Sequence, residues 1–572
     1  MSKTWKLRPH NDDLERSLLE SGQEPIMARL LSQRNITPDV VRDFFDANLS
    51  ELENYKPLGG TPEAAQMLID LAKEKKGVCI LGDYDADGVM STAMMVFICR
   101  KLGIPYHVFI PDRFKHGYGL NPKSVEAFNQ DVQATNPGLI IALDCGTSSE
   151  NEMKILKQSG AKILVIDHHI PNEGQKSISA DILINWRLCG GSEMCTAGQV
   201  LMLAKAIDNL SKTSLFTELL PMAAIGTVAD ISPIVWENRI IVRNGLSRAG
   251  NSPSLGLRMI VESMYLGDVE VSQSDVSFRI APRINSAGRV QKAELAYRLM
   301  VEEDIGSAGA LLNEIENLNM ERRELCSKIT EEAIEQARKQ SFKNGLMLIN
   351  PEWHIGVVGI VASRIVEEFG VPALVMGSSK GMVKGSGRSL DGINIKAVLD
   401  SCSELFDVYG GHEMAVGASL KSESLSIAPQ KFDEACGKYY EKNGRPDFSQ
   451  YYDIDLHPNS VRILIPKMLK DNLFPYCDQH NPEPIFKLWG VKVTNCSITN
   501  RDGWRRVTYT IESLEGRRIP MKLVTFDESY GPGLIDKTID VFFKFPQMIN
   551  TKWEPSLELI DIVYAGDKKD LL

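Results

Sequence analysis

The sequence lacks the segments that insert a protein into a membrane or export it. No apolar run is long enough to span a bilayer, and Met1 to Leu19 carries charges where a signal peptide has an apolar core. The 10 cysteines form no Cys-x-x-Cys pair, so we expect free thiols and neither disulfides nor a zinc site. These absences favour a cytoplasmic protein.

The sequence also lacks an excess of basic residues. It contains 64 Lys and Arg residues against 75 Asp and Glu residues, which gives a formal net charge of -11. Proteins that coat nucleic acid by bulk electrostatic attraction need a basic surface, so this balance argues against that class. A nucleic-acid-binding protein of this composition needs clustered basic residues and acidic residues that hold cations, because bound divalent ions invert the local field.

The chain is long enough for several domains. It has 572 residues, of which 43% are hydrophobic and 24% charged, as is usual for globular proteins. Its patterns predict an α/β protein with five segments. These are 1–55, an N-terminal segment; 56–300, an α/β domain; 301–340, a connecting helix; 341–443, a smaller α/β domain; and 447–566, a β-rich barrel or sandwich.

Short apolar runs alternate with amphipathic stretches in the first α/β domain, which predicts a parallel, doubly wound sheet. The expected strands are Val78 to Leu81, His107 to Ile110, Leu139 to Leu143, Ile163 to Ile166 and Ile182 to Ile184. Apolar residues at helical spacing between Glu303 and Gln340 predict one long helix. Two helices of a bundle fit the same pattern, because Asn317 and Asn319 are weak helix formers.

Carboxylates and histidines follow the ends of three expected strands. They are Asp83, Asp85 and Asp87 after the first strand, Asp144 after the third, and Asp167, His168 and His169 after the fourth. Parallel strands end at a common edge, which is the binding edge of such sheets. Adjacent carboxylates repel one another unless cations lie among them, and an excess of carboxylates favours Mn²⁺ or Mg²⁺. A calcium loop at 83–88 is the weaker reading, because its twelfth-position Glu is missing.

Four motifs occur together: GDYDADG at 82–88, LDCG at 143–146, VIDHH at 165–169 and GTVAD at 226–230. Their order and spacing resemble the DHH phosphoesterase superfamily, named for Asp167-His168-His169. Further segments narrow the resemblance to the RecJ exonucleases. They are DRFKHGYGL at 112–120, RINSAGR at 283–289, WHIGVVGIVASR at 353–364, GSGRS at 385–389 and GGHEMAVG at 410–417.

The resemblance implies a fold and an activity. It implies a DHH domain and a DHH-associated domain joined by the long helix, followed by a barrel of the oligonucleotide-binding (OB) type. It also implies a hydrolase that degrades single-stranded DNA from its 5′ end by two-metal catalysis, releasing 5′ mononucleotides in recombination and repair. Alternatives are a phosphodiesterase for short oligonucleotides or cyclic dinucleotides, and a noncatalytic single-strand-binding scaffold.

The resemblance also assigns roles to residues. Two Mn²⁺ or Mg²⁺ ions are expected on Asp85, Asp87, Asp144, His168 and Asp230, with Asp144 as the bridge. Catalytic roles fall to Asp144, to Asp83 and to His169, which orients the site or helps activate water. Substrate contacts are expected from Arg113, Arg283, Asn285, Arg289, His354, Ser386, Arg388 and His412. Of these, Arg113, Ser386 and Arg388 resemble a pocket for the terminal 5′ phosphate.

The last predictions concern the binding partners and two segments that differ from the usual sequences of the family. The resemblance implies a monomer that works on single-stranded DNA with single-strand-binding protein and a RecQ-type helicase. Two segments depart from the usual glycine-rich sequences, namely Met194 to Gln199 and Tyr476 to Pro484. We expect these changes to affect strand affinity and partner docking and to leave the metal centre unaffected.

Overall fold

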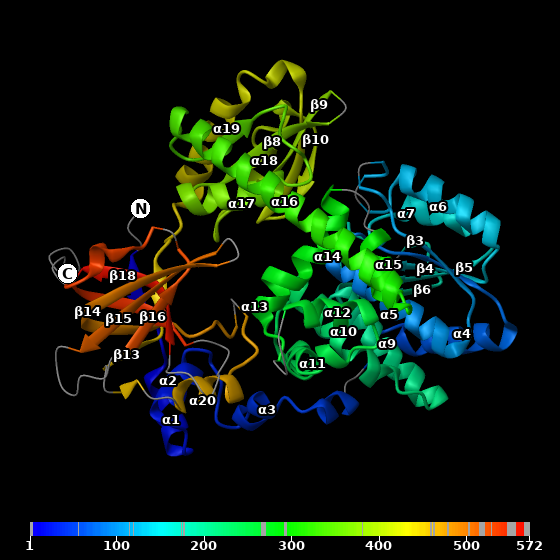
Figure 1. Ribbon diagram of the computed structural model, residues 1–572. Helices are drawn as coiled ribbons and strands as arrows, with labels where there is room; N and C mark the ends of the chain where they lie inside the picture. Colours follow the sequence, from blue (N-terminus) through cyan, green and yellow to red (C-terminus); the bar gives the residue numbers. More distant parts are fainter. Residues whose placement is uncertain are drawn as a thin grey trace.

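Three lobes make up the molecule, with the first α/β domain opposite the barrel domain and the second α/β domain above both (Figure 1). The computed structural model describes residues 4–54, 57–113, 115–117, 119–172, 174–175, 178–264, 270–290, 294–379, 381–457, 460–461, 464–477, 480–501, 504–513, 521–527, 529–545 and 556–564. Among these residues no helix is long and apolar enough to cross a membrane.

The first α/β domain contains a parallel sheet in the order β3-β2-β4-β5-β6, which confirms the predicted architecture. Its strands are β2 (Val78–Leu81), β3 (Tyr106–Phe109), β4 (Leu139–Leu143), β5 (Lys162–Ile166) and β6 (Ile182–Ile184). Both faces are covered by apolar cores. One core includes α4 (Thr61–Glu74), α5 (Ala86–Leu102) and α9 (Thr196–Ser211), and the other includes α6 (Pro122–Thr135) and α7 (Glu150–Lys157).

The apolar residues that follow the acidic run predict a helix that begins near Ser91, but helix α5 begins inside the acidic run, at Ala86. Asp85 is the N-cap residue, and its Oδ1 accepts a hydrogen bond from the backbone N–H of Gly88 at 3.0 Å. A carboxylate at the cap and one in the first turn both interact favourably with the helix N-terminus. The expected start was wrong because the helix starts with the acidic residues of the run, Asp85 at the N-cap and Asp87 in the first turn, and not with its apolar residues.

Further helices complete the first domain and lead into the connecting helix. They are α10 (Leu215–Ala229), α11 (Trp236–Leu246), α12 (Leu255–Met264), α13 (Gln273–Asp275), α14 (Ala281–Val290) and α15 (Glu294–Val301). Helix α16 (Ile305–Lys339) is one helix of 35 residues, so the two-helix alternative is wrong. Asn319 is buried within it and accepts a hydrogen bond from Arg322, which offsets its weak helix propensity.

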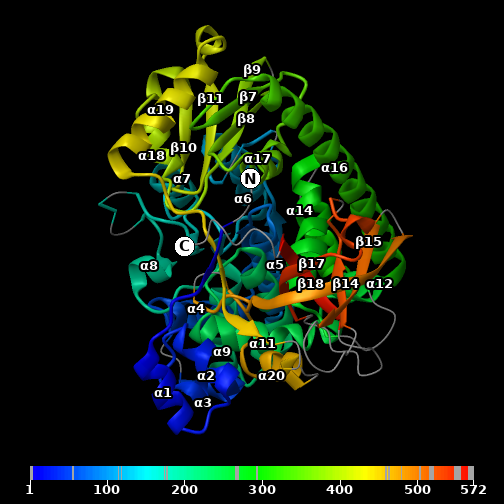
Figure 2. The same ribbon diagram turned by 90° about the vertical axis from the view of Figure 1, so that its left-hand side faces the viewer.

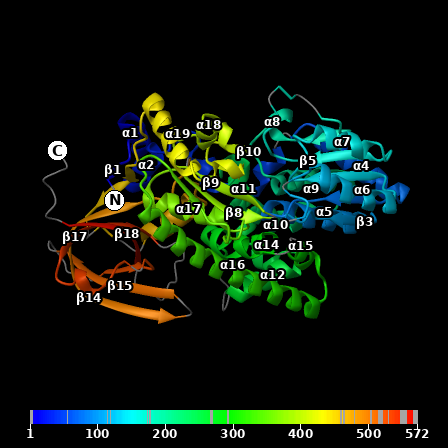
Figure 3. The ribbon, with the colours of Figure 1, turned by 90° about the horizontal axis from the view of Figure 1, so that it is seen from above.

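The second α/β domain contains a five-stranded mixed sheet in the order β10-β11-β9-β8-β7. Its strands are β7 (Leu346–Ile349), β8 (Ala373–Ser379), β9 (Met382–Arg388), β10 (Phe406–Gly411) and β11 (Ala415–Leu420). Its helices are α17 (Val358–Phe369), α18 (Ile395–Asp400) and α19 (Ala428–Asn443). Seen from above, α16 runs between this domain and the first (Figure 3).

The barrel domain confirms the expected OB-like architecture. Its strands are β13 (Ile454–Leu456), β14 (Phe486–Arg501), β15 (Trp504–Ser513), β16 (Met521–Thr525), β17 (Thr538–Lys544) and β18 (Ser556–Tyr564). Strands β14, β15, β16, β18 and β17 follow one another in that order, and pairing of β14 with β17 closes the barrel. This order and closure are those of an OB fold.

The N-terminal segment packs on the barrel domain, and its helices lie beside α20 (Leu464–Asn472) of that domain in two perpendicular views (Figure 1, Figure 2). Strand β1 (Trp5–Leu7) pairs in parallel with β12 (Gln450–Tyr452). Apolar residues of α1 (Asp12–Glu20) and α2 (Pro25–Ser32) share one core with α20 and the barrel strands. The N-terminal segment therefore packs as part of the barrel domain.

A buried arginine joins this unit to the first α/β domain. Arg239 of α11 donates hydrogen bonds of 2.8 to 3.0 Å to the backbone carbonyls of Phe44, Asn472, Leu473 and Pro475. In the altered segment after Tyr476, Asn481 accepts a hydrogen bond from Arg34 at 2.7 Å. The described part of this segment therefore belongs to a joint between domains.

Candidate metal centre and phosphate pocket

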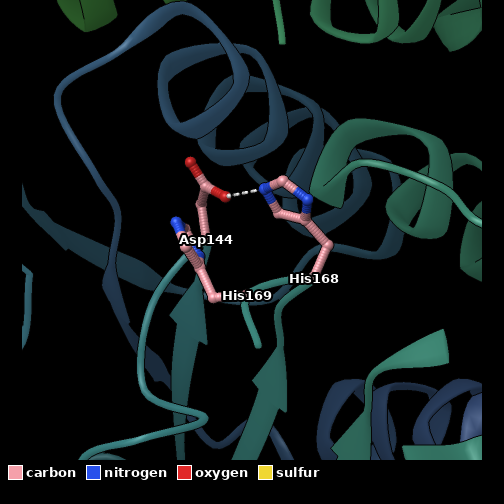
Figure 4. Close-up of side chains that lie close together, drawn as sticks. All are labelled: Asp144, His168 and His169. Atoms are coloured by element: carbon pink, nitrogen blue, oxygen red, sulfur yellow. Dashed lines mark ion pairs between the residues drawn. The ribbon is translucent and has the colours of Figure 1, made fainter. Parts of the chain in front are cut away.

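Seven side chains form one cluster at the carboxyl edge of the parallel sheet. Three overlapping groups have their nitrogen or oxygen atoms within 4.8 Å of one another, and they share Asp144 and His168. The groups are Asp83, Asp85 and Asp144; Asp144, His168 and His169; and Asp87, His168 and Asp230. In Figure 4 both histidines lie beside the Asp144 carboxylate. The structure thus brings together all the predicted metal and catalytic residues.

Asp144 lies at the centre of this cluster. Its side chain is buried, and its Oδ1 accepts a hydrogen bond from Thr196 Oγ1 at 3.0 Å and lies 3.3 Å from His168 Nε2. Its backbone has a φ of 61°, the left-handed region that side chains other than glycine rarely adopt. Such strain persists where surrounding structure enforces it, commonly at functional sites.

The start of helix α9 holds Asp87 in place. The backbone N–H groups of Thr196 and Ala197 donate to the two carboxylate oxygens of Asp87 at 2.8 and 2.9 Å. These residues lie in the altered segment Met194 to Gln199, which we had expected to leave the metal centre unaffected. This segment contacts the metal centre directly, through hydrogen bonds to both Asp87 and Asp144, and the expectation that its changed residues leave the centre unaffected stays a prediction.

Asp230 reaches the cluster from the C-terminal end of α10. Its Oδ1 lies 3.7 Å from His168 Nε2, and its Oδ2 accepts a hydrogen bond from Ser232 Oγ at 2.7 Å. One turn earlier, a Cβ on Gly226 would lie 2.6 Å from Ala197 Cβ and 2.9 Å from Asp87 Oδ1. Glycine at position 226 is therefore required for α10 to approach the Asp87 carboxylate.

His169 is oriented by Asp167. Its Nδ1 lies 2.7 Å from Asp167 Oδ1, and Asp167 Oδ2 accepts a hydrogen bond from the backbone N–H of Thr147 at 2.9 Å. Burial alone would lower the pKa of His169, but the bond to Asp167 and the charges of Asp167 and Asp144 together outweigh burial and raise this pKa to about 9. With Nδ1 engaged, Nε2 is the ring nitrogen left for the cluster.

The carboxylates of the cluster are poorly stabilised as a group of anions. Burial, followed by the charge of Asp85, raises the pKa of Asp83 to about 7. Burial also raises the pKa of Asp230 to about 7 and the pKa of Asp144 well above its usual range. Oδ1 of Asp83 is buried without a hydrogen-bond partner among the described residues. The cluster offers more carboxylate than imidazole ligands, and Asp83 Oδ1 remains without a hydrogen bond. This composition fits hard divalent cations.

A group of arginines, Arg113, Arg289 and Arg388, lies beside this cluster, and we call it the arginine pocket. A Cβ at Gly359 of α17 would lie 3.1 Å from Arg388 Nη2 and 3.3 Å from Ser386 Oγ, so all three residues face one point. Burial and then the nearby charges of Arg113, Arg322 and Arg388 lower the pKa of Arg289 to about 10. Among the described residues, no carboxylate forms an ion pair with Arg113, Arg289 or Arg388.

The pocket is linked to the acidic run at 83–87. The guanidinium of Arg113 lies 5.7 Å from the ring centroid of Tyr84, which stands between Asp83 and Asp85. Across the domain boundary, Arg289 Nη1 donates to the Gly356 carbonyl at 3.5 Å, and a Cβ on Gly356 would lie 2.0 Å from the Arg289 carbonyl. The two α/β domains therefore meet at the pocket.

The remaining predicted substrate residues have different surroundings. Arg283 forms an ion pair of 2.6 Å with Glu316 of α16, so its charge is already engaged. Burial and the nearby Arg113 hold the pKa of His354 below its usual range despite the charge of Glu321. Asn285 Oδ1 is buried without a hydrogen-bond partner among the described residues, and His412 is exposed in the turn between β10 and β11.

Sequence reasoning missed the residues that support the cluster. It gave no role to Thr196, Ala197, Ser232 or Thr147, which bond to cluster carboxylates or to Asp167. It also missed Arg322 of α16, which lies near the pocket and whose charge helps to lower the pKa of Arg289. Arg322 is one helical turn from Cys326 on the same helix. Ser and Thr next to a motif Asp are a weak signal, because such pairs are common in turns.

Comparison with known families matches both α/β domains. Residues 77–227 match the N-terminal domain of the DHH family, and residues 343–438 match the DHHA1 domain. The fold and the acidic cluster thus define a DHH-family protein.

Individual relatives narrow the assignment. The single-stranded-DNA-specific exonuclease RecJ of Escherichia coli is 31% identical over 85% of this chain and 87% of its own length. The same-named protein of Bacillus subtilis is 33% identical over 84% of this chain and 61% of its own length. RecJ from Thermus thermophilus in complex with Mn²⁺ has a TM-score of 0.79 at 26% identity, covering 98% of this chain and 79% of that chain. The complex of the same protein with Mg²⁺ has a TM-score of 0.74 at 25% identity, covering 98% of this chain and 78% of that chain.

The chain therefore belongs to the RecJ family. It spans 61% of the length of the Bacillus subtilis relative and most of the Escherichia coli relative.

Substituting Gly226→Ala tests the packing at Asp87. The new methyl group meets Ala197 and Asp87, so we expect the carboxylate to move and the affinity for Mn²⁺ to fall by about tenfold or more. Gly250→Ala is the matched control, because a Cβ there meets nothing within 4 Å. Isothermal titration of Mn²⁺ into each protein measures the effect. Equal affinities in the two variants would contradict the assigned packing.

Metal binding should depend on pH. Asp83 and Asp230, with pKa values of about 7, hold protons in the metal-free protein that a cation must displace. Affinity for Mn²⁺ should therefore rise from about pH 6 to about pH 8, with proton release. Since these pKa values are raised on folding, the metal-free protein should lose stability over the same rise in pH. Calorimetry in buffers of different ionisation enthalpy counts the protons, and binding without proton release would contradict the account.

Proposed function

We propose that this protein is a divalent-metal-dependent exonuclease that degrades single-stranded DNA from the 5′ end and releases 5′ mononucleotides. The observation that carries the proposal is the arginine pocket directly beside the acidic cluster, joined to it through Arg113 and Tyr84. The RecJ relatives, named as single-stranded-DNA-specific exonucleases, support the substrate and the reaction.

The acidic cluster suits two Mn²⁺ or Mg²⁺ ions, the ions held by Thermus thermophilus RecJ. We assign Asp85, Asp87, Asp144, His168 and Asp230 as their ligands, with Asp83 contributing its unpartnered oxygen. When bound, such a pair of cations supplies Lewis-acid activation of water and neutralises charge on the scissile phosphate. Asp144 would be the ligand that the two cations share, as the resemblance implies; it belongs to two of the three ligand groups, as His168 also does.

The protein's own residues position the substrate at this centre. Asp167 holds His169 so that Nε2 faces the cluster, where it binds the attacking water or a phosphate oxygen. Thr196 and the start of α9 keep Asp87 and Asp144 in place, so the ligands need little rearrangement when cations bind. This arrangement acts on a phosphodiester without a covalent intermediate.

The arginine pocket gives the 5′ specificity. Arg388 and Ser386 of β9, together with Arg113 and Arg289, lack anionic partners among the described residues and suit a terminal phosphate. A guanidinium donates two parallel hydrogen bonds to phosphate, and a terminal phosphate carries more negative charge than an internal one. Holding the terminus there places the first phosphodiester at the metal centre, which makes the enzyme an exonuclease.

The wider setting of the activity is also a proposal. The OB-like barrel offers a second surface for the strand, as OB folds commonly do. We expect a monomer that works in the cytoplasm, with single-strand-binding protein and a RecQ-type helicase as partners. The resemblance to the RecJ family supports this setting.

The activity is tested with a long single strand labelled at either end, in Mn²⁺ or Mg²⁺. We expect labelled mononucleotide to appear early only from the 5′-labelled strand, because the terminal phosphate is held in the pocket. Asp144→Ala should abolish release, since it removes the bridging ligand. Cleavage of dinucleotides alone would assign a short-substrate phosphodiesterase, and strand binding without cleavage would assign a scaffold.

The pocket is tested with strands that carry a 5′ phosphate or a 5′ hydroxyl. Wild type should prefer the phosphorylated strand, and Arg388→Ala should reduce this preference by about tenfold or more, because a charge-assisted hydrogen bond is lost. Arg445→Ala, which changes an exposed arginine, is the control. Comparison of kcat/KM for both strands measures the preference, and an unchanged ratio in Arg388→Ala would overturn the assignment.

A further inference from the structure

Positive charge continues beyond the arginine pocket, along two helices that lie side by side. Helix α16 carries Arg322 and helix α17 carries Arg364, and apolar side chains of the two helices share one core (Figure 1, Figure 3). Among the described residues, no carboxylate forms an ion pair with either arginine. We call Arg322 and Arg364 the outer arginines.

The outer arginines meet at one face of α16. Arg322, Cys326 and Thr330 follow one another at intervals of four residues, which places them on the same face of the helix. Arg364 reaches this face from α17, because its Nη1 donates to Thr330 Oγ1 at 3.4 Å. Burial raises the pKa of the Cys326 thiol, and the charges of Arg322, Arg364 and Arg289 oppose this rise. Arg289 of the pocket therefore lies close to both outer arginines.

The arginines form a row that leads from the acidic cluster into the second α/β domain. Arg113 lies beside the cluster, and Arg289 contacts Gly356 at the domain boundary. Arg388 lies next to Gly359, in the first turn of α17. Arg364 follows Gly359 by five residues, about 7.5 Å farther along the helix axis. An anion that extends from the pocket away from the metal centre therefore meets the outer arginines.

The row carries more positive charge than a terminal monophosphate balances. The arginine pocket and the outer arginines together supply five guanidinium groups, whereas a phosphate monoester carries about −1.5 to −2 at pH 7. Burial lowers the pKa of Arg322, and the charges of Arg323 and Arg364 lower it further. Like charges held this close repel one another unless an anion lies among them.

Two simpler roles account for only part of this arrangement. Arg364 is exposed, so taken alone it fits a solvated surface charge, but the half-buried Arg322 and its place next to the pocket do not. Internal phosphates of a bound strand are also a poor match. In the proposed function the strand passes from the pocket to the metal centre, whereas the outer arginines lie on the other side of the pocket.

We propose that the outer arginines extend the arginine pocket so that it accepts a strand with a 5′ triphosphate. The inference rests on the proposed exonuclease function and names a further substrate for it. The phosphate next to the sugar stays at Arg388 and Ser386, and the two outer phosphates lie along Arg322 and Arg364. A guanidinium donates two parallel hydrogen bonds to phosphate, and a triphosphate carries roughly twice the charge of a monophosphate.

The first turnover on such a strand releases a nucleoside triphosphate. Water attacks the phosphorus of the first internucleotide phosphodiester, the bond from this phosphorus to the 3′ oxygen of the first nucleotide breaks, and that oxygen takes up a proton. The products are the first nucleotide with its triphosphate intact and a strand with a 5′ monophosphate. Later turnovers release mononucleotides. Such 5′ ends arise where a strand is started from a nucleoside triphosphate without a primer.

Binding of three strands of one sequence tests the extended pocket. The strands carry a 5′ hydroxyl, monophosphate or triphosphate and a fluorescent label at the 3′ end, and chelator prevents cleavage. By fluorescence anisotropy, wild type should bind the triphosphate strand about tenfold or more tightly than the monophosphate strand, because charge-assisted hydrogen bonds are added. Arg364→Ala changes an exposed side chain and should remove most of this advantage, and Arg322→Ala should act in the same way.

Arg338→Ala is the matched control, because it removes an exposed arginine of α16 that pairs with Glu368. It should leave the advantage of the triphosphate unchanged. Equal binding of the monophosphate and triphosphate strands by wild type would refute the proposal, as would an advantage that survives both Arg364→Ala and Arg322→Ala. If these variants weaken all three strands by the same factor, the outer arginines bind internal phosphates and the proposal is wrong.

Cleavage in Mn²⁺ separates this inference from the proposed function. We expect nucleoside triphosphate as the first product from the triphosphate strand, and release of inorganic phosphate or pyrophosphate before it would contradict the reaction. A protein that binds the triphosphate end tightly and cleaves no strand would lose the exonuclease assignment and keep this site. A protein that degrades monophosphate strands and shows no preference for the triphosphate would lose this inference alone.

Discussion

Repulsion among buried carboxylates at one sheet edge is the constraint on which the rest of the structure depends. Asp83, Asp87 and Asp144 are almost completely buried, and Asp85 and Asp230 lie within the same cluster. Burial raises the pKa of most of these groups, so the protein alone does not stabilise them as anions. The arrangement is stable with cations among the carboxylates, and the site is organised to receive them.

The surrounding elements follow from this constraint. Helices α5, α9 and α10 all end or begin at the cluster, and the backbone N–H groups at the start of α9 bind Asp87 directly. The second α/β domain places Arg388 and Ser386 next to this negative region, where Arg113 and Arg289 complete a positive pocket. A chain with a net charge of -11 thus concentrates positive charge at the place where we propose that the terminal phosphate binds.

Much of this could be predicted from local pattern. Strands β2, β4 and β6 begin and end where their apolar runs do, and the parallel-sheet rule places the motif carboxylates at one edge. The start of α5 was misplaced because Asp85 caps the helix. The support from Thr196, the capture of Asn481 by Arg34 and the packing of the N-terminal segment on the barrel depend on contacts between distant segments, which periodicity does not encode.

The central claim is that Asp144 joins two divalent ions in one site. Titration of the protein with Mn²⁺, followed by electron paramagnetic resonance, tests it most directly, because ions about 4 Å apart couple magnetically. The account predicts a coupled spectrum at two equivalents in wild type and only isolated ions in Asp144→Asn. Binding of a single ion by wild type, or a coupled spectrum that survives the substitution, would contradict it.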